Sequence, residues 1–198
     1  AQQIPLSSTY NYNKFIINPA LTGIYKRPQL YLIHRDQWTA LPGNPVTDAL
    51  TVESALKNDR IGLGGMIYNN NEGLTNTFGG RFAYAYKLKT GAESFLSLGL
   101  GIGLNRLGIS FGDVFVSNPN DPSIFNFNEM NRTTFDAVGG ANFNWRKLNV
   151  GFAIPNLVNT KAKFHKNDTL VNTSASFLYA RNLAANLSYE FALTKDGN

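Results

Sequence analysis

Strict alternation of residue character over 95–105 is the feature that most constrains how this chain can fold. Every second residue is aliphatic: Leu96, Leu98, Leu100, Ile102 and Leu104. The residues between them are small or polar: Ser97, Gly99, Gly101, Gly103 and Asn105. Successive side chains of a β-strand point to opposite sides, so a period of two predicts a strand. One face of this strand would be apolar, and the nearly bare opposite face would suit a crowded or water-filled interior.

The same period recurs along the chain. It is clear over 76–88, 133–145, 148–154 and 183–193, and weaker over 29–38, 46–56, 61–68 and 174–179. A bulge is expected at Gly64-Gly65, where the alternation is interrupted. Aromatic residues make up 13% of the chain and charged residues only 16%, against roughly 25% charged residues in soluble domains. We therefore predict an all-β protein of about nine antiparallel strands.

Strand length and loop length favour a membrane barrel over a soluble sandwich. Several predicted strands reach the ~9–11 residues that a membrane-spanning strand needs, whereas soluble strands average ~5–6. Short connections at 57–60, 89–92, 146–147 and 180–182 contrast with long ones at 106–132 and 156–173, and those at 39–45 and 69–75 are intermediate. Short turns on one side and long loops on the other are typical of outer-membrane barrels. The prediction is a transmembrane antiparallel up-and-down β-barrel, with a soluble sandwich as the alternative.

This topology divides the chain into a periplasmic N-terminal segment, residues 1–28, and an outer-membrane β-barrel, residues 29–198. Single-chain bacterial barrels have even strand numbers. A count of about nine therefore means either that the count is wrong by one or that the barrel is C-terminally incomplete at Asn198. Ala1-Gln2-Gln3 resembles the end left by signal-peptide cleavage. We expect an exported bacterial outer-membrane protein whose signal peptide has been removed.

No motif predicts catalysis, a cofactor or a resident metal. The net charge of +5 comes from scattered bases, which argues against nucleic-acid binding. The His34-Arg35-Asp36 triplet lies in a strand pattern without the other kinase motifs, and the alternating glycines of 99–103 lie within a strand instead of a phosphate-binding turn. Oxygen ligands for calcium gather in one loop, where a simple turn is the competing interpretation: Asp113, Asn118, Asn120 and Asp121.

Several short motifs, in order, resemble those of one known family. The chain contains Asn18-Pro19-Ala20-Leu21-Thr22-Gly23 and Arg35-Asp36-Gln37-Trp38, followed by Pro45 and Thr47. Further matches follow at Ile61–Gly65, Tyr86–Lys89, Leu98–Leu100 and Asn120–Pro122. Together they resemble the PorP/SprF family of membrane proteins of the type IX secretion and gliding system. The resemblance covers almost the whole chain.

The resemblance implies an outer-membrane barrel of about fourteen strands, surrounded by outer-membrane lipid and without enzymatic activity. Its partners would be the C-terminal domain of a secreted cargo such as a cell-surface adhesin, or the type IX translocon and its periplasmic ring. The implied contact surfaces are 4–28, 106–132 and 156–173. The motif residues that could contact a partner are Asn18, Pro19, Ala20, Gly23, Arg35, Gln37, Trp38, Pro45 and Thr47.

Two alternatives stay open. Arg35 and Gln37 facing the lumen, with Trp38 anchored at the membrane interface, would give these three residues a structural role in place of cargo contact. At the level of function, the alternative is a diffusion channel or transporter. Its polar lining would include the inward positions Arg81, Lys87, Asp136 and Glu190.

Overall fold

A computed structural model describes residues 13–56, 58–110, 129–158, 161–165, 174–178 and 182–191. Two 3₁₀ turns come first, η2 (Lys14–Ile16) and η3 (Pro19–Leu21). The strands are β1 (Gln29–Asp36), β2 (Val46–Leu56), β3 (Ile61–Glu72), β4 (Thr75–Lys89), β5 (Ser94–Ser110), β6 (Glu129–Trp145), β7 (Leu148–Ile154), β8 (Lys161–His165), β9 (Ser174–Leu178) and β10 (Ala184–Tyr189).

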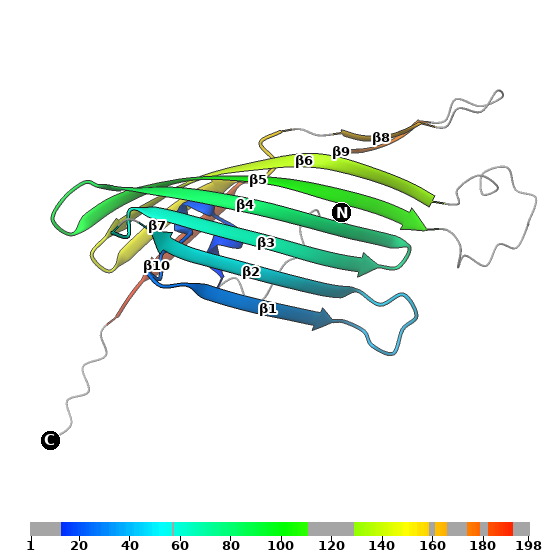
Figure 1. Cartoon of the computed structure of the whole chain (residues 1–198), viewed down its shortest axis with the longest axis horizontal. Coiled ribbons are helices and arrows are strands. Elements are labelled where there is room, and N and C mark those ends of the chain that lie inside the picture. The colour runs from blue at the N-terminus through cyan, green and yellow to red at the C-terminus, as the bar shows by residue number, and fades with distance from the viewer. Residues whose placement is uncertain are drawn as a thin grey trace, which may run out of the picture.

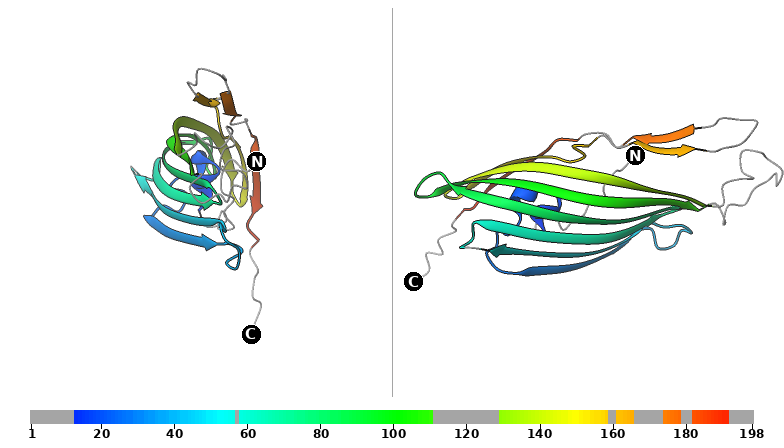
Figure 2. Two further views of the ribbon diagram at one scale, coloured as in Figure 1. Left: turned by 90° about the vertical axis from the view of Figure 1, so that its right-hand side faces the viewer. Right: turned by 45° about the horizontal axis from the view of Figure 1, so that its top comes forward.

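Eight strands form one sheet in the order β1-β2-β3-β4-β5-β6-β7-β10, and every neighbouring pair is antiparallel. The sheet curls into a half-barrel, which is clearest in the end-on view of Figure 2. β8 and β9 pair separately as a two-stranded sheet next to β6 (Figure 1). The all-β, up-and-down prediction is confirmed. In the described chain β1 and β10 are the two edges of the half-barrel.

Three local predictions are wrong. The expected bulge at Gly64-Gly65 is absent, because Gly64 pairs with Glu53 and Gly65 with Val52 in unbroken register. The expected 69–75 link is only a two-residue turn, since β3 runs to Glu72 and β4 begins at Thr75. The expected loop over 156–173 contains β8. The 69–75 and 156–173 predictions failed because these stretches are polar and lack a clear alternation, although their backbones pair as strands.

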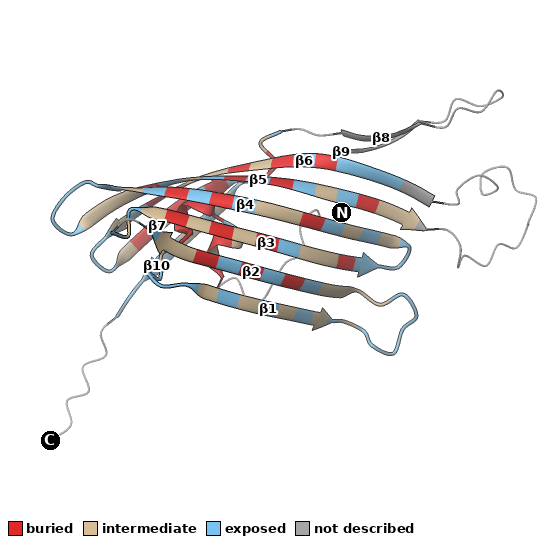
Figure 3. Ribbon diagram, in the orientation of Figure 1, coloured by how far each residue is buried: buried red, intermediate tan, exposed pale blue. Residues whose placement is uncertain are grey.

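The two faces of the sheet differ in character, as the period of two predicts. Large apolar side chains cover the convex face: Leu32 is 82% exposed, and Phe82, Leu100, Leu104 and Phe152 are between 50% and 57% exposed. Small or polar residues of the concave face are buried, as Figure 3 shows along β2 to β7. An inside-out distribution of this kind suits a sheet whose outer surface contacts lipid.

The buried apolar core lies inside the curl. Phe15 of the N-terminal segment packs against Met66 of β3 and Ala83 of β4. The blue segment within the curl in Figure 1 is this part of the chain. Among the described residues, the structure contains no helix that is long and apolar enough to cross a membrane.

Candidate functional site

Residues 13–23, here called the inner segment, lie against the concave face of the sheet (Figure 2). The sequence sets its local shape. The Asn18 side chain accepts a hydrogen bond from the Ala20 amide at 3.0 Å, which caps η3, and Pro19 occupies the first position of the turn. The Thr22 hydroxyl donates to the Pro19 carbonyl at 2.7 Å and closes the turn. Asn18 to Gly23 are all buried.

Glycines of the sheet make room for this segment. A methyl carbon added to Gly62 would lie 2.0 Å from the Thr22 carbonyl oxygen, and one on Gly99 would lie 2.1 Å from the Ala20 amide nitrogen. On Gly140 it would lie 2.1 Å from Oδ1 of Asn18. Only glycine allows the two backbones to approach this closely. The bare face that the sequence predicts is therefore crowded, because backbone of the same chain occupies it.

Two opposite charges hold Gly23, the last residue of the inner segment. The Gly23 amide donates to Oε2 of Glu53 on β2 at 2.7 Å, and Nζ of Lys87 on β4 donates to the Gly23 carbonyl at 2.7 Å. Glu53 is only 2% exposed. Gly23 has φ of +69°, a conformation that L-residues adopt at a cost. Charge-assisted hydrogen bonds are stronger than neutral ones, so these two bonds hold Gly23 firmly against β2 and β4.

Tyr25 lies two residues after Gly23 in the sequence. Partial burial raises the pKa of Tyr25, and the nearby ionisable groups of Tyr31 and Glu53 raise it further. A neutral phenol can serve as a hydrogen-bond donor.

A buried ion pair holds the middle of the inner segment. Arg81 on β4 contacts Asp136 on β6 at 3.0 Å, and both side chains are 8% exposed. The other guanidinium nitrogen donates to the Ile16 carbonyl at 3.1 Å. The pair therefore binds the inner segment while it bridges the sheet across β5.

Asparagines extend the attachment to the other side of the curl. Nδ2 of Asn18 donates to the Ala141 carbonyl at 3.3 Å and to Oδ1 of Asn186 at 3.4 Å. Asn186 on β10 donates in turn to Asn149 on β7 at 3.2 Å. At the opposite side, Asn13 donates to the Thr51 hydroxyl on β2 at 2.5 Å. The inner segment thus connects strands from β2 to β10.

The motif residues predicted from the sequence fall into two groups. Asn18, Pro19, Ala20 and Gly23 all belong to the inner segment. Arg35, Gln37, Trp38, Pro45 and Thr47 lie at the end of the sheet that carries the 37–45 loop, here called the loop end. Thr47 and Glu53 are six residues apart on β2, about 20 Å at ~3.4 Å per residue. The structure therefore does not bring the two groups together.

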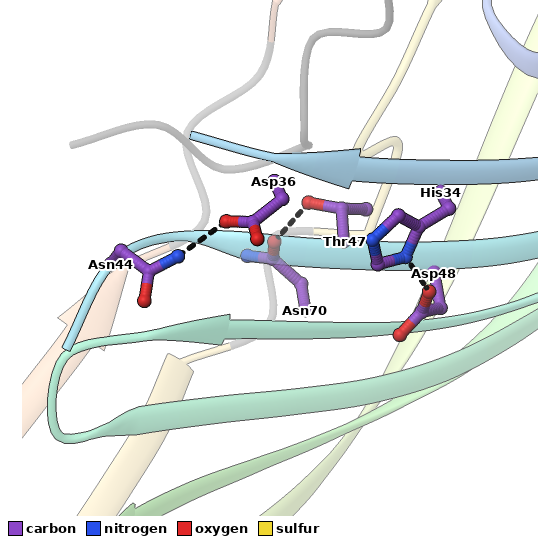
Figure 4. Close-up of polar contacts among 6 residues, drawn as sticks. All are labelled: His34, Asp36, Asn44, Thr47, Asp48 and Asn70. Carbon is purple, nitrogen blue, oxygen red and sulfur yellow. Dashed lines mark hydrogen bonds and ion pairs between the residues drawn. The ribbon is translucent and has the colours of Figure 1, made fainter. Parts of the chain in front are cut away.

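The second group shapes the loop end between β1 and β2. Arg35 and Thr47 are cross-strand partners on the concave side, and the Gln37 amide donates to the Pro45 carbonyl at 3.0 Å, continuing the ladder. The Thr47 hydroxyl donates to Oδ1 of Asn70 at 2.6 Å (Figure 4). Trp38 has φ of +58° and is 70% exposed.

The His34-Arg35-Asp36 triplet is divided by the strand. His34 and Asp36 point to the convex side, where His34 contacts Asp48 at 2.7 Å and Asn44 donates to Asp36 (Figure 4). Arg35 points to the other side, so the three side chains form no common site. The described residues contain no group of three potential metal-ligating side chains. The proposed calcium ligands of 113–121 lie outside the described residues.

Sequence reasoning identified Arg81, Lys87 and Asp136 as inward-facing, and the channel alternative would have placed them in the lining of a pore. In the structure they contact the inner segment or each other. Glu53 was missed, although it lies on the inward register of β2 with Thr47 and Thr51. Its position in an alternating strand was the signal that could have found it. Glu190, the fourth predicted lining residue, is exposed.

Comparison with known proteins gives one result. A family model described as type IX secretion system membrane protein PorP/SprF matches residues 1–198. No curated protein and no solved structure matches the chain.

Proposed function

We propose, because the chain belongs to the PorP/SprF family of type IX secretion system membrane proteins, that it is a filled outer-membrane barrel that binds or anchors secreted cargo or links the membrane to the secretion machinery. In this proposal the convex face contacts lipid and the loop end faces the cell exterior. The protein acts by binding, without catalysis.

The observation that carries this proposal is the occupied concave face. The inner segment contacts strands from β2 to β10, and its residues Asn13, Phe15, Asn18 and Thr22 are no more than 1% exposed. Of the polar residues that would line an aqueous pore, Arg81 and Lys87 donate to backbone carbonyls of the inner segment, and Asp136 pairs with Arg81. A filled interior supports a scaffold, since a diffusion channel needs an open, water-lined path.

Cargo would be bound at the loop end. Trp38 is the most prominent candidate there, because an exposed aromatic ring supplies much apolar contact area at low entropic cost. The backbone hydrogen bond between Gln37 and Pro45 holds the loop that carries Trp38. Cargo contact by Trp38 and its anchoring at the membrane interface remain the two hypotheses for this side chain.

Pull-down from native membranes tests the proposal. The tagged protein should recover a secreted protein through its C-terminal domain, or components of the translocon or periplasmic ring. Trp38→Ala should weaken cargo recovery if Trp38 contacts cargo, while Trp145→Ala, at the opposite end of the sheet, serves as the matched control. Recovery of neither cargo nor machinery by the wild-type protein would refute the proposal.

The competing function is a diffusion channel or transporter. It would require the inner segment to leave the concave face. Planar-bilayer recordings distinguish the two: a filled scaffold should give no steady conductance, whereas a stable open channel would favour the alternative.

A further inference from the structure

A boundary between apolar and polar residues crosses the convex face. One cross-strand row is entirely apolar or glycine, and it runs Leu32, Leu50, Ile67, Gly80, Leu104 and Phe135. The next row toward the loop end, here called the boundary row, is largely polar and runs His34, Asp48, Asn69, Phe78, Arg106 and Thr133. In a membrane barrel, such a change marks where hydrocarbon meets headgroups.

The length of the apolar band agrees with this position. On β5 the apolar outward residues extend from Leu96 to Leu104. These eight steps are about 27 Å along the strand, or about 21 Å along the membrane normal at a tilt of ~40°. The apolar band of outer-membrane barrels is ~25 Å tall. Arg106, one outward position beyond Leu104, therefore lies at headgroup level.

A hollow lies in the apolar surface directly below the boundary row. It has a volume of about 660 Å³ and an almost wholly apolar lining. Gly65 and Gly80, diagonal neighbours on β3 and β4, form its floor. Its outward-facing walls include Leu50, Val52, Ile67, Phe82, Ile102, Leu104 and Phe135. We call it the outer hollow.

Nothing in the described chain requires glycine at these two positions. A methyl carbon on Gly80 would lie no closer than 3.6 Å to any atom, and one on Gly65 no closer than 3.7 Å. Both are ordinary van der Waals contacts, unlike the 2.0–2.1 Å clashes at Gly62, Gly99 and Gly140. Glycine weakens a strand interior and often marks a close approach of another molecule. The outer hollow therefore fits a thin apolar group from outside the chain.

Arg106 supplies a charge one outward position beyond Leu104, which lines the outer hollow, on the side of the loop end. It lines a second, more polar hollow of about 350 Å³ together with Asn76 and Asn131. The ion pairs formed among the described residues do not include Arg106. Its cross-strand neighbours, Phe78 and Thr133, are uncharged. An exposed guanidinium flanked by amide groups is suited to a phosphate.

From this arrangement we propose that the convex face binds one phosphate-bearing lipid, with an acyl chain in the outer hollow and the phosphate at Arg106. The proposal rests on the membrane placement proposed above. A single acyl chain satisfies both observations, because its thickness suits a groove floored by two glycines and its headgroup reaches the level of Arg106. A protein partner on the same surface is the competing occupant.

Native mass spectrometry of the full-length protein in detergent tests the proposal. After removal of endogenous lipid, three probes are titrated: dioleoyl phosphatidic acid, dioleoylglycerol, which lacks the phosphate, and glycerol 3-phosphate, which lacks the chains. Phosphatidic acid should bind at least about tenfold more tightly than either other probe, since both halves of the site contribute. Equal binding of phosphatidic acid and dioleoylglycerol would overturn the proposal.

Two variants with matched controls locate the site. Arg106→Glu should weaken phosphatidic acid binding about tenfold or more. Lys89→Glu should not, because Lys89 is an exposed cation on β4 at the opposite end of the sheet. Gly80→Leu should fill the hollow and also weaken binding, whereas Ala141→Leu, on the same face of β6, should not. Heat-modifiable gel migration verifies that each variant is folded.

The outcomes separate this proposal from the proposed function. If a variant and its control lose phosphatidic acid binding equally, the lipid site is overturned. It is also overturned if Gly80→Leu displaces a co-purifying protein and leaves lipid binding unchanged. If carbonate washing releases the wild-type protein from membranes, the membrane placement itself is wrong. If the protein stays in membranes and binds phosphatidic acid without selectivity, only the lipid site fails.

Discussion

Replacing Gly99 with alanine should displace the inner segment from the sheet. The added methyl carbon would lie 2.1 Å from the Ala20 amide nitrogen and 2.3 Å from the Pro19 carbonyl carbon. Both are backbone atoms in a capped turn, so no flexible side chain can move aside. Ordinary contact begins near 3.4 Å. The inner segment, which is tightly packed here, therefore has to move about 1.3 Å away from β5.

The loss of stability can be estimated from the hydrogen bonds that this movement breaks. The hydrogen bonds of Asn18 to Ala141 and Asn186 are 3.3 and 3.4 Å long and cannot lengthen further. Each contributes about 0.5–1.5 kcal/mol, and overpacking costs about 1–3 kcal/mol. We expect Gly99→Ala to lower the free energy of unfolding by about 2–6 kcal/mol.

The matched control is Gly80→Ala on the convex face. There the nearest atom is 3.6 Å from the added methyl carbon, so nothing clashes. Alanine is more favourable than glycine within a strand by about 0.5–1 kcal/mol. This variant should therefore be as stable as the wild type or slightly more stable.

Two assays on the detergent-solubilised protein measure the effect. Urea unfolding reports stability, and limited trypsin digestion with mass spectrometry reports cleavage after Lys14, which lies within the inner segment. Cleavage should accelerate in Gly99→Ala and stay at the wild-type rate in Gly80→Ala. If Gly99→Ala is as stable and as resistant at Lys14 as the wild type, the inner segment does not pack against β5 as described.

Three further predictions concern other parts of the molecule. Gly23→Ala should lower the free energy of unfolding by about 1–3 kcal/mol, because φ is +69° and the methyl carbon would lie 2.9 Å from a backbone oxygen; urea unfolding checks this. Asp136→Ala should cost about 3–5 kcal/mol in the same assay, because Arg81 would stay buried without its counter-charge; an unchanged midpoint would contradict the burial of the pair. Leu100→Arg should lower membrane stability by about 2–4 kcal/mol and Thr133→Arg by no more than about 1 kcal/mol. Stability is measured by refolding into lipid vesicles. Equal losses in the two variants would contradict the placement of Leu100 in the hydrocarbon layer and Thr133 at headgroup level.

Alternation predicted the strands well because lipid on one side and packed protein on the other impose opposite demands on successive residues. The predicted boundaries of β2 and β7 match the structure. β7 alternates from end to end, whereas β2 alternates only in its middle. The extensions of β3 to Glu72 and β4 from Thr75 were missed because their outward residues lie beyond the apolar band, where polar side chains are equally suitable. β8 was missed because five residues in a polar stretch give too short a pattern.

The inner segment could not be predicted from periodicity. Its 3₁₀ turns are three residues each, and its contacts join residues up to 168 positions apart, as between Asn18 and Asn186. The family motif identified Asn18 to Gly23 as noteworthy without indicating where they lie. The glycines of β3, β5 and β6 indicated a face with little space, but only the structure shows that the chain's own backbone fills it.

Hydrogen exchange of the wild-type protein in lipid nanodiscs tests the central claim most directly, namely that the inner segment fills the concave face. The amides of Thr22 and Gly23 donate to the Pro19 carbonyl and to Glu53 and are buried. They should exchange as slowly as the amides of β3 and β4 beside them. Exchange of these two amides at the rate of an unstructured peptide would contradict the filled interior and the scaffold role inferred from it.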